Sequence, residues 1–431
     1  MGRFATNLRL RRGTGLLTAL FALALPLSAN GQRTGTIYAR DFSLMEASEL
    51  GFEIEARAVG TSWERQGAEA AVLIVYLDGM RNQDLLLWSG DSFFTYRILL
   101  GRASAGRHTV SLSLDAASRA KNARAVEIRS ARPLLFNRAN TSEEDLIAIA
   151  NAPIIGARSD SIERFTDIPL LMYYELTRGP EDLLRLRYTL IFSNEDGGTQ
   201  TAALMARWGR TTDIEWVYEL SLRGGRIEEA SYQGVEHRTK PFAGRKIQGD
   251  HPLLTVVSSN NNFSDLPSPT RRFAPLPIRV ELKSASRESV MDAHPWIYRI
   301  MAEELKREGR IGESPSDLDK IADPRDYLYI EARAEAKSGP IAFEVQMDGA
   351  RRAFRSDGCD ERLCVEREGY FRAAVRLPKD YDPRRITSLR IRCCGCRENL
   401  SCSPERVKVL RAFKLDRDYI PHQLEVDRWL R

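Results

Sequence analysis

The sequence lacks the features that would place it in a common enzyme class. Cysteine is absent before position 359, and the whole chain has only five histidines. There is no P-loop, no G-x-S-x-G nucleophile turn, no H-E-x-x-H zinc motif and no glycine fingerprint for a dinucleotide. These absences argue against nucleotide-dependent enzymes, zinc proteases and serine hydrolases of the α/β type.

An excess of charge of one sign is also missing. The chain has 64 Lys and Arg against 59 Asp and Glu, and the two signs are mixed along its length. A net charge of +5 with this distribution does not predict nucleic acid as a partner. With 431 residues, 43% hydrophobic and 29% charged, the chain is typical of a globular protein of two or three domains.

Long apolar runs are confined to the start of the chain. Four arginines precede residue 13, an apolar stretch runs from Gly15 to Leu27, and Ala29-Asn30-Gly31 forms a small-x-small cleavage site. This pattern predicts a signal peptide over residues 1–31 and a mature chain from Gln32. No later stretch approaches about 18 continuous apolar residues, so no membrane span is predicted. We therefore expect a secreted or periplasmic protein.

Cysteine usage agrees with export. The six cysteines all lie near the C-terminus, at Cys359, Cys364, Cys393, Cys394, Cys396 and Cys402. An even number in an exported chain predicts disulfides, although the pairing cannot be read from the sequence. Neighbouring Cys393 and Cys394 should bond to different partners, because a bridge between adjacent residues strains the disulfide geometry. A zinc cluster is the alternative, and it is less favoured because no histidine lies among the cysteines.

A long-period repeat organises the chain. The pentapeptide Ile54–Ala58 recurs as Ile330–Ala334, and each copy is followed by an apolar run that ends in an Asp-Gly pair, Asp78-Gly79 or Asp348-Gly349. Three more strand-like segments then follow in the same order in both halves. Five matches in order indicate an internal duplication.

The pattern of apolar residues predicts the fold class. Both copies alternate apolar and polar residues in short runs separated by Gly, Asp and Pro turns, which is typical of antiparallel β-sandwiches. We predict a mainly β protein with a few short helices, in which two similar sandwich domains flank a different central β domain. The expected boundaries are 1–31 for the signal peptide, 32–139 for the first copy, 140–270 for the central domain, 271–322 for a linker and helical segment, and 323–431 for the second copy.

Two helices are expected outside the sandwiches. The first should begin after Thr141 as the N-cap, with Glu144 completing a capping box. The second should run from Pro295 to Gly309, with Trp296 and Ile300 on its apolar face.

The central domain holds the best candidate for chemistry. In one predicted strand, Ile214, Trp216 and Tyr218 take one face, so that Asp213 and Glu215 share the other, with backbones some 6 to 7 Å apart. Three interpretations are open: a solvated sheet face, a pair of catalytic carboxylates, or a divalent-cation site. The cation site would add side chains from nearby loops to the two acids: Asp196, Asp250 and His237, with the run from Asn260 to Asn262 as further binding residues.

The same residues resemble a known family. The stretch Gly209–Glu215, GRTTDIE, is similar to the Gly-His-Arg-His-Asp-Trp-Glu signature of necrosis-inducing-type secreted proteins. Gly209, Asp213 and Glu215 match the signature, whereas Arg210 and Thr212 replace its histidines and Ile214 replaces its tryptophan. The resemblance covers about a third of the chain. It implies a β-sandwich that holds a divalent cation such as calcium, and the missing histidines leave membrane-attacking activity without its expected side chains.

Together these features predict an exported, multidomain protein that binds extracellular or envelope material, with glycan as the expected partner. Trp88 is a candidate platform for a sugar ring, with a role in the core as the alternative. The main alternative function is a secreted hydrolase that acts on polysaccharide through the central acidic residues. A structural interaction protein of the cell surface is the third possibility.

Overall fold

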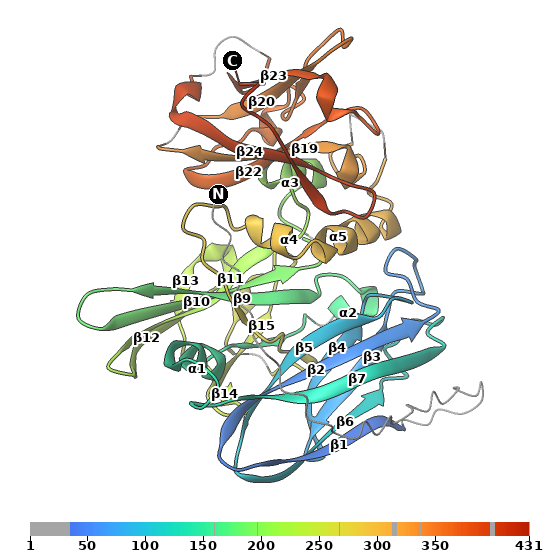
Figure 1. Ribbon diagram of the computed structural model, residues 1–431, viewed down its shortest axis with the longest axis vertical. Coiled ribbons are helices and arrows are strands. Elements are labelled where there is room, and N and C mark those ends of the chain that lie inside the picture. The colour runs from blue at the N-terminus through green and yellow to red at the C-terminus, as the bar shows by residue number, and fades with distance from the viewer. Residues whose placement is uncertain are drawn as a thin grey trace, which may run out of the picture.

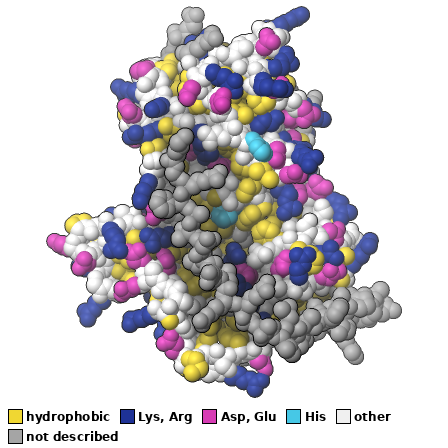
Figure 2. Space-filling model, viewed as in Figure 1, with side chains coloured by type: hydrophobic (Ala, Val, Ile, Leu, Met, Phe, Trp, Pro, Cys, Tyr) yellow, Lys and Arg dark blue, Asp and Glu magenta, His cyan; other side chains and the backbone are white. Residues whose placement is uncertain are grey.

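The computed structural model describes residues 35–430, apart from 159, 196, 267, 313–316, 337 and 397–400. The predicted signal peptide lies outside the described residues. The chain forms three β-rich parts: the C-terminal copy lies at one end of the long axis, the first copy at the other, and the central part beside the first copy (Figure 1). On the face shown in Figure 2, charged side chains of both signs are scattered over the upper part and the flanks, and hydrophobic side chains gather near the middle.

The first copy consists of two antiparallel sheets. One has the strand order β1-β6-β3-β4, formed by Thr36–Leu44, Gly106–Leu114, Ala71–Leu77 and Met80–Leu87. The other has the order β5-β2-β7, formed by Phe94–Ala103, Ser48–Val59 and Ala125–Phe136. The apolar residues that alternate along β2, among them Phe52, Ile54 and Ala56, are fully buried.

The second copy also consists of two antiparallel sheets. One has the order β22-β19-β24-β25, formed by Gly369–Arg376, Tyr327–Ala334, Val407–Leu415 and Pro421–Leu424. The other has the order β21-β20-β23, formed by Phe354–Arg355, Ile341–Met347 and Ile386–Cys393. The prediction of a mainly β, sandwich-rich fold with few helices is confirmed.

The two copies share their strand order. The sheet β5-β2-β7 corresponds to β22-β19-β24, and β6-β3-β4 corresponds to β23-β20-β21. The ladder between β2 and β7 shifts register between Glu55 and Ala56, and the ladder between β19 and β24 shifts between Glu331 and Ala332. A bulge at the same position of the repeated pentapeptide is hard to obtain by chance, because a bulge is a local departure that each ladder specifies separately.

The hairpins that carry the Asp-Gly pairs differ in length. In the first copy, Asp78 and Gly79 both have positive φ, 53° and 75°, and form a two-residue turn between β3 and β4. This is the turn type that joins twisted strands most directly. In the second copy, residues 348–353 connect β20 to the two-residue strand β21.

The central part has two facing sheets. The larger has the order β13-β12-β11-β10-β9-β18, formed by Thr239–Pro241, Arg226–Gln233, Ile214–Arg223, Leu183–Phe192, Pro169–Arg178 and Ile278–Arg279. The smaller has the order β14-β15-β8-β17 with β16 beside β15, formed by Lys246–Ile247, His251–Val256, Ile154–Gly156, Arg272–Phe273 and Phe263–Ser264. Strands β17 and β18 come from the segment predicted as a linker.

The described residues contain the α-helices α1 Glu143–Ala150, α2 Ser161–Arg164, α3 Thr201–Trp208, α4 Ser289–Ala293 and α5 Trp296–Arg307. Helix α1 follows the first copy, α2 and α3 lie between strands of the central part, and α4 and α5 precede the second copy. The cap of α1 is Ser142, whose side chain accepts a hydrogen bond from the backbone N–H of Asp145, so the prediction of Thr141 as the cap is wrong by one residue. Helix α3 was not predicted. Among the described residues, no helix combines the length and apolar character needed to cross a membrane.

The equivalent sheets of the two copies use their outer faces differently. In the second copy, helix α5 runs beside the β22-β19-β24 sheet (Figure 1). Tyr329 and Phe413 stack with ring centroids 4.8 Å apart and pack against Tyr298 of α5. In the first copy, the ladder positions equivalent to Tyr329 and Phe413 hold Glu53 and Arg132, which form an exposed ion pair. The first face therefore stays in water, and the second is covered by helices of the same chain.

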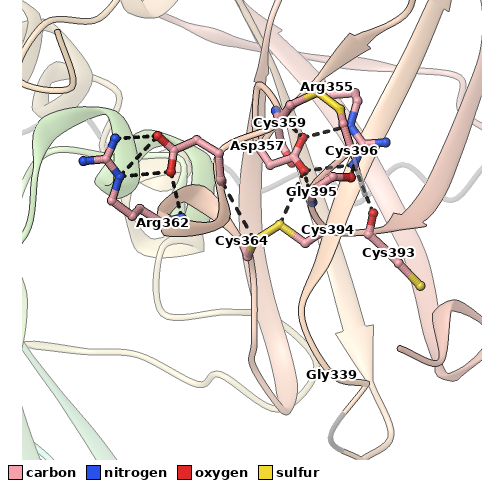
Figure 3. The surroundings of a disulfide bond; sticks show 12 residues. Gly339, Arg355, Asp357, Cys359, Arg362, Cys364, Cys393, Cys394, Gly395 and Cys396 are labelled. Atoms are coloured by element: carbon pink, nitrogen blue, oxygen red, sulfur yellow. Dashed lines mark hydrogen bonds and ion pairs between the residues drawn. A yellow bond between two sulfur atoms is a disulfide. The ribbon is translucent and has the colours of Figure 1, made fainter. Parts of the chain in front are cut away.

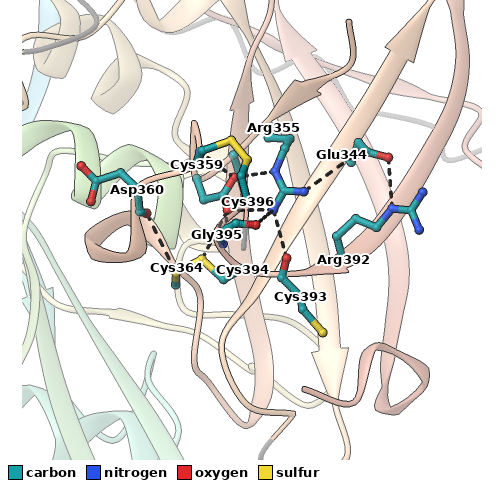
Figure 4. Close-up of polar contacts among 12 residues, drawn as sticks. Glu344, Arg355, Cys359, Asp360, Cys364, Arg392, Cys393, Cys394, Gly395 and Cys396 are labelled. Atoms are coloured by element: carbon teal, nitrogen blue, oxygen red, sulfur yellow. Dashed lines mark hydrogen bonds and ion pairs between the residues drawn. A yellow bond between two sulfur atoms is a disulfide. The ribbon is translucent and has the colours of Figure 1, made fainter. Parts of the chain in front are cut away.

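The six cysteines form three disulfides, Cys359–Cys396, Cys364–Cys394 and Cys393–Cys402, which confirms the prediction that Cys393 and Cys394 have different partners. The buried Asp357 accepts hydrogen bonds from the backbone of Cys359 and Gly395 and pairs with Arg355 (Figure 3). Arg355 also donates to the carbonyls of Cys393 and Gly395, which ties the two cysteine-bearing loops together (Figure 4).

Candidate functional site

The acidic residues of the signature-like stretch lie at the start of β11 and are buried. Asp213 is 1% exposed and Glu215 is 8% exposed. Ile214 between them packs into the core that the first copy shares with α5, so the two acids point to the opposite side, toward the smaller central sheet. The interpretation of a solvated sheet face is therefore wrong for this pair.

The predicted register of β11 is correct only for part of the strand. The ladder between β10 and β11 shifts, so that Tyr188 pairs with Tyr218 and Thr189 pairs with Trp216, with Val217 as the extra residue. Beyond this bulge, Tyr218 and Leu220 pack into the central core, whereas Ile214 packs into the other core. The expectation that Ile214 and Tyr218 share one face is therefore wrong, because a bulge reverses the alternation of side chains.

Several loops bring polar residues to the same end of the central sandwich. Glu195 follows β10, Gln233 ends β12, His237 lies in the turn after β12, and the loop 257–262 joins β15 to β16. Antiparallel strands alternate in direction, so the ends of β10, β12 and β15 lie beside the start of β11. This is why residues far apart in the sequence meet at Asp213 and Glu215.

A continuous hydrogen-bond chain connects Glu195 to Glu215. In the orientation of the Asn260 amide that satisfies its neighbours, Nδ2 donates to Glu195 Oε1 at 3.1 Å and Oδ1 accepts from His237 Nε2 at 3.0 Å. Gln233 Nε2 lies 3.0 Å from His237 Nδ1 and also donates to Glu215. With Gln233 donating to Nδ1, the ring proton that His237 donates to Asn260 lies on Nε2. The His237 side chain is 51% exposed, so the chain reaches solvent in its middle.

Asn261 joins the second part of the cluster. Its Nδ2 donates to Asp213 Oδ2 at 3.1 Å and to Asp167 Oδ1 at 3.3 Å. Asp167, Glu236, His237 and Asn261 all have φ between 46° and 60°, although none of them is glycine. Non-glycine residues rarely adopt this left-handed conformation, and they concentrate at sites where function maintains the strain.

Two carboxyl groups of the cluster have raised pKa values. Burial, followed by repulsion from Asp213, raises the pKa of Glu195 to about 7. Burial, followed by repulsion from Glu215, raises the pKa of Asp213 to about 7. The arginines Arg210 and Arg287 act in the opposite direction on both groups. The cluster therefore exchanges a proton near neutral pH, which is a common property of functional sites.

The structure brings together only part of the predicted site. Asp213, Glu215, His237, Asn260 and Asn262 converge, with Asn262 Nδ2 3.5 Å from His237 Nδ1. Asp196 lies outside the described residues.

Asp250 is exposed and pairs with Lys246, and it lines a surface hollow with Leu222 at the opposite end of β11. Within the described residues, no three His, Cys, Asp or Glu side chains are grouped so that they could hold a metal ion. Among the described members of the predicted metal set, Asp250 therefore lies apart from Asp213, Glu215 and His237.

Trp88 is a core residue and does not lie on an open face of the sheet. Its ring is 4% exposed and stacks on Trp296, with centroids 4.8 Å apart, while Phe94 and Tyr96 pack against its other sides. These aromatic residues line a cavity of about 150 Å³ between the first copy, β9 and α5. A sugar ring cannot stack on Trp88 as the sequence suggested, because Trp296 already covers it.

Three residues of the cluster were not predicted. Glu195 is next to the predicted Asp196, which lies outside the described residues, so the sequence had pointed to this acidic turn. Asp167 was not predicted either, whereas Asn261 belongs to the predicted run from Asn260 to Asn262. Gln233 offered no signal, because a glutamine at the end of a strand is common and only the position of His237 gives it a role.

Comparisons with known proteins add little to this geometry. No protein-family model matches the sequence, and no curated protein matches it either. Among solved structures, the EclA C-terminal domain, a sugar-binding protein, is 15% identical with a TM-score of 0.21, over 28% of this chain and 82% of that one.

A ruminal GH26 endo-beta-1,4-mannanase is 9% identical with a TM-score of 0.19, over 33% of this chain and 27% of that one. Neither is a necrosis-inducing protein, and similarity at this level carries no argument about function.

Proposed function

We propose that this chain is an exported protein that binds glycan of extracellular or envelope material at the polar cluster of its central part. The observation that carries the proposal is the hydrogen-bond chain through Asn260, His237 and Gln233, which is held in one orientation and opens to solvent at a half-exposed imidazole. Amides, imidazoles and carboxylates held in fixed positions are the groups that recognise sugar hydroxyls, each of which donates and accepts.

Export is part of the same proposal. All six cysteines are in disulfides, and such bonds persist in oxidising compartments. The near balance of charge favours a neutral ligand over nucleic acid.

The test is binding of the full chain to a panel of neutral oligosaccharides, with wild type compared with His237→Ala. His422→Ala is the matched control, because His422 is 59% exposed and is paired with Asp416 at 2.9 Å, away from the cluster. We expect His237→Ala to weaken binding by about tenfold, which corresponds to one lost hydrogen bond. Binding that both variants reduce equally, or no binding to any member of the panel, would contradict the proposal.

A hydrolase that acts on polysaccharide is the second candidate. The raised pKa values of Glu195 and Asp213 favour it, because a carboxyl group with a pKa near 7 can serve as a general acid or base at neutral pH. Release of reducing ends from a polysaccharide, abolished by Asp213→Asn while binding persists, would establish this activity. Binding without turnover would leave the first proposal as the function.

A further inference from the structure

Arg210 occupies the interior beside the acidic cluster. It follows α3 and Gly209, whose φ of 61° turns the chain back under the second copy. The Arg210 side chain is 2% exposed, and its Nη1 donates to the carbonyl of Thr212 and lies 4.0 Å from Asp213 Oδ1. On its other side, Nε lies 3.5 Å from Glu288 Oε1. A guanidinium in this position contributes a permanent positive charge, because arginine does not lose its proton in proteins.

Glu288 extends the network toward α4. It is fully buried, and Arg287 and Arg367 approach its Oε1 to 3.8 and 3.5 Å. The neighbouring arginines outweigh the burial that opposes ionisation, so the pKa of Glu288 falls to about 2. Glu288 is thus ionised at neutral pH, and its negative charge offsets part of the positive charge of the surrounding arginines. Arg210 lies between Glu288 and Asp213.

The side-chain amides around the acids direct their N–H groups at the carboxylates, whereas a cation would need their oxygens. Asn261 presents its N–H to Asp213, Gln233 presents its N–H to Glu215, and Asn260 presents its N–H to Glu195. A divalent cation of the calcium type is held by carboxylate and amide oxygens together. Here the amides donate to the carboxylates instead, which satisfies the same oxygens that an ion would require.

We propose that Arg210 is a built-in counter-cation of the acidic cluster, so that the cluster is assembled without a divalent ion. The amide donors and Arg287 complete the compensation. The cation that the resemblance implies is therefore replaced by a side chain of the protein itself. This inference goes beyond glycan binding and does not depend on it, because it concerns the cluster in the absence of ligand.

The experiment measures the Tm of the full chain in EDTA, in calcium and in magnesium. The wild type should have the same Tm in all three, whereas an ion held at a hundredfold excess over its Kd would raise Tm by several degrees. Arg210→Met keeps the length of the side chain but removes its charge, and should lower Tm in EDTA. Calcium should then restore part of the loss, because the carboxylates are left uncompensated.

Two further variants make the result decisive. Arg210→Met combined with Asp213→Asn should recover part of the lost stability and respond less to calcium than Arg210→Met alone, because Asp213 no longer needs a counter-cation and Glu288 keeps Arg287 and Arg367. Arg187→Met is the matched control, since Arg187 pairs with Glu219 on the exposed part of the same sheet. A wild-type Tm that rises with calcium or magnesium, and no longer does so in Asp213→Asn, would overturn the proposal even if Arg210→Met fails to fold. Failure of glycan binding with a cation-independent Tm would overturn only the proposed function.

Discussion

Arg372 attaches the second copy to the rest of the chain, and its removal should loosen that copy selectively. The side chain is 0% exposed and lies on the outer face of the β22-β19-β24 sheet. Its guanidinium donates to Glu331, to Tyr298 and, through two nitrogens, to Asp292, at distances from 2.6 to 3.1 Å. Asp292 and Tyr298 belong to α4 and α5, so these bonds cross from the second copy to the helices.

The loss of stability expected in Arg372→Met depends on the charges that the substitution leaves buried without a partner. Removing one partner of a buried ion pair costs about 3 to 5 kcal/mol, because the other charge stays buried without compensation. In Arg372→Met, Asp292 keeps its ion pair with Arg411, and the methionine still fills the space of the arginine stem. We therefore expect a value at the lower end, about 3 kcal/mol. That corresponds to a rise of about 100-fold in the population with the second copy detached.

Native-state proteolysis of the connection between α5 and β19 reports this population directly. Its rate should rise by about 100-fold in Arg372→Met when opening is fast relative to cleavage. Arg97→Met is the matched control, because Arg97 lies on the equivalent sheet of the first copy, is 57% exposed and pairs with Glu53. An exposed pair is worth at most about 1 kcal/mol. Equal effects of the two substitutions, or an unchanged rate in Arg372→Met, would refute the role given to Arg372.

Two further predictions concern pH and the disulfides. The pKa of Asp213 is about 7 in the folded chain against an ordinary value of 3.8, so its contribution to stability is complete below about pH 4 and is lost as the pH rises toward 7. The Tm of wild type should therefore fall between pH 5 and pH 8 more steeply than that of Asp213→Asn, and parallel curves would contradict the pKa. Replacing Cys359 and Cys396 by alanine should destabilise the second copy by about 1 kcal/mol more than replacing Cys393 and Cys402, because the loops span 37 and 9 residues. Urea midpoints measure the difference, and the reverse order would contradict the loop-entropy argument.

The sequence predicted the fold class because alternation of apolar and polar residues is a local property that reports burial directly. The pairing of Cys393 and Cys394 with different partners was predicted for the same kind of reason, since local geometry forbids the alternative. The helix that contains Ile300 was found with nearly correct bounds, Trp296–Arg307 against the expected Pro295–Gly309. The internal duplication remains an inference, and the shared strand order and shared bulge support it.

The candidate site was predicted only where residues are neighbours in the sequence. Asp213 and Glu215 were recognised as a pair, but whether their face is buried was left open, because the bulge at Val217 reverses the strand faces and leaves no mark in the apolar pattern. Gln233 and Glu195 could not be assigned, since their roles depend on a fold that brings the ends of β10 and β12 together. In the sequence, Arg210 stood out only because it replaces a histidine of the signature. Its role as a counter-cation could be proposed only from the structure, which places it beside the buried Glu288.

The different use of the two equivalent sheet faces has a consequence for how the protein can be divided for expression. A fragment that begins at residue 323 would expose Tyr329 and Phe413 to water and would leave Glu331 without the backbone N–H of Ser286. Such a surface favours self-association over solubility. A fragment of the second copy that starts before Ser286, and so retains α4 and α5, carries its own cover for this face, although the opposite side of α5 would then be open. A gene fusion should therefore transfer the second sandwich together with α4 and α5. The sequence repeat places the domain boundary at residue 323, whereas the buried face of the sheet places it before Ser286.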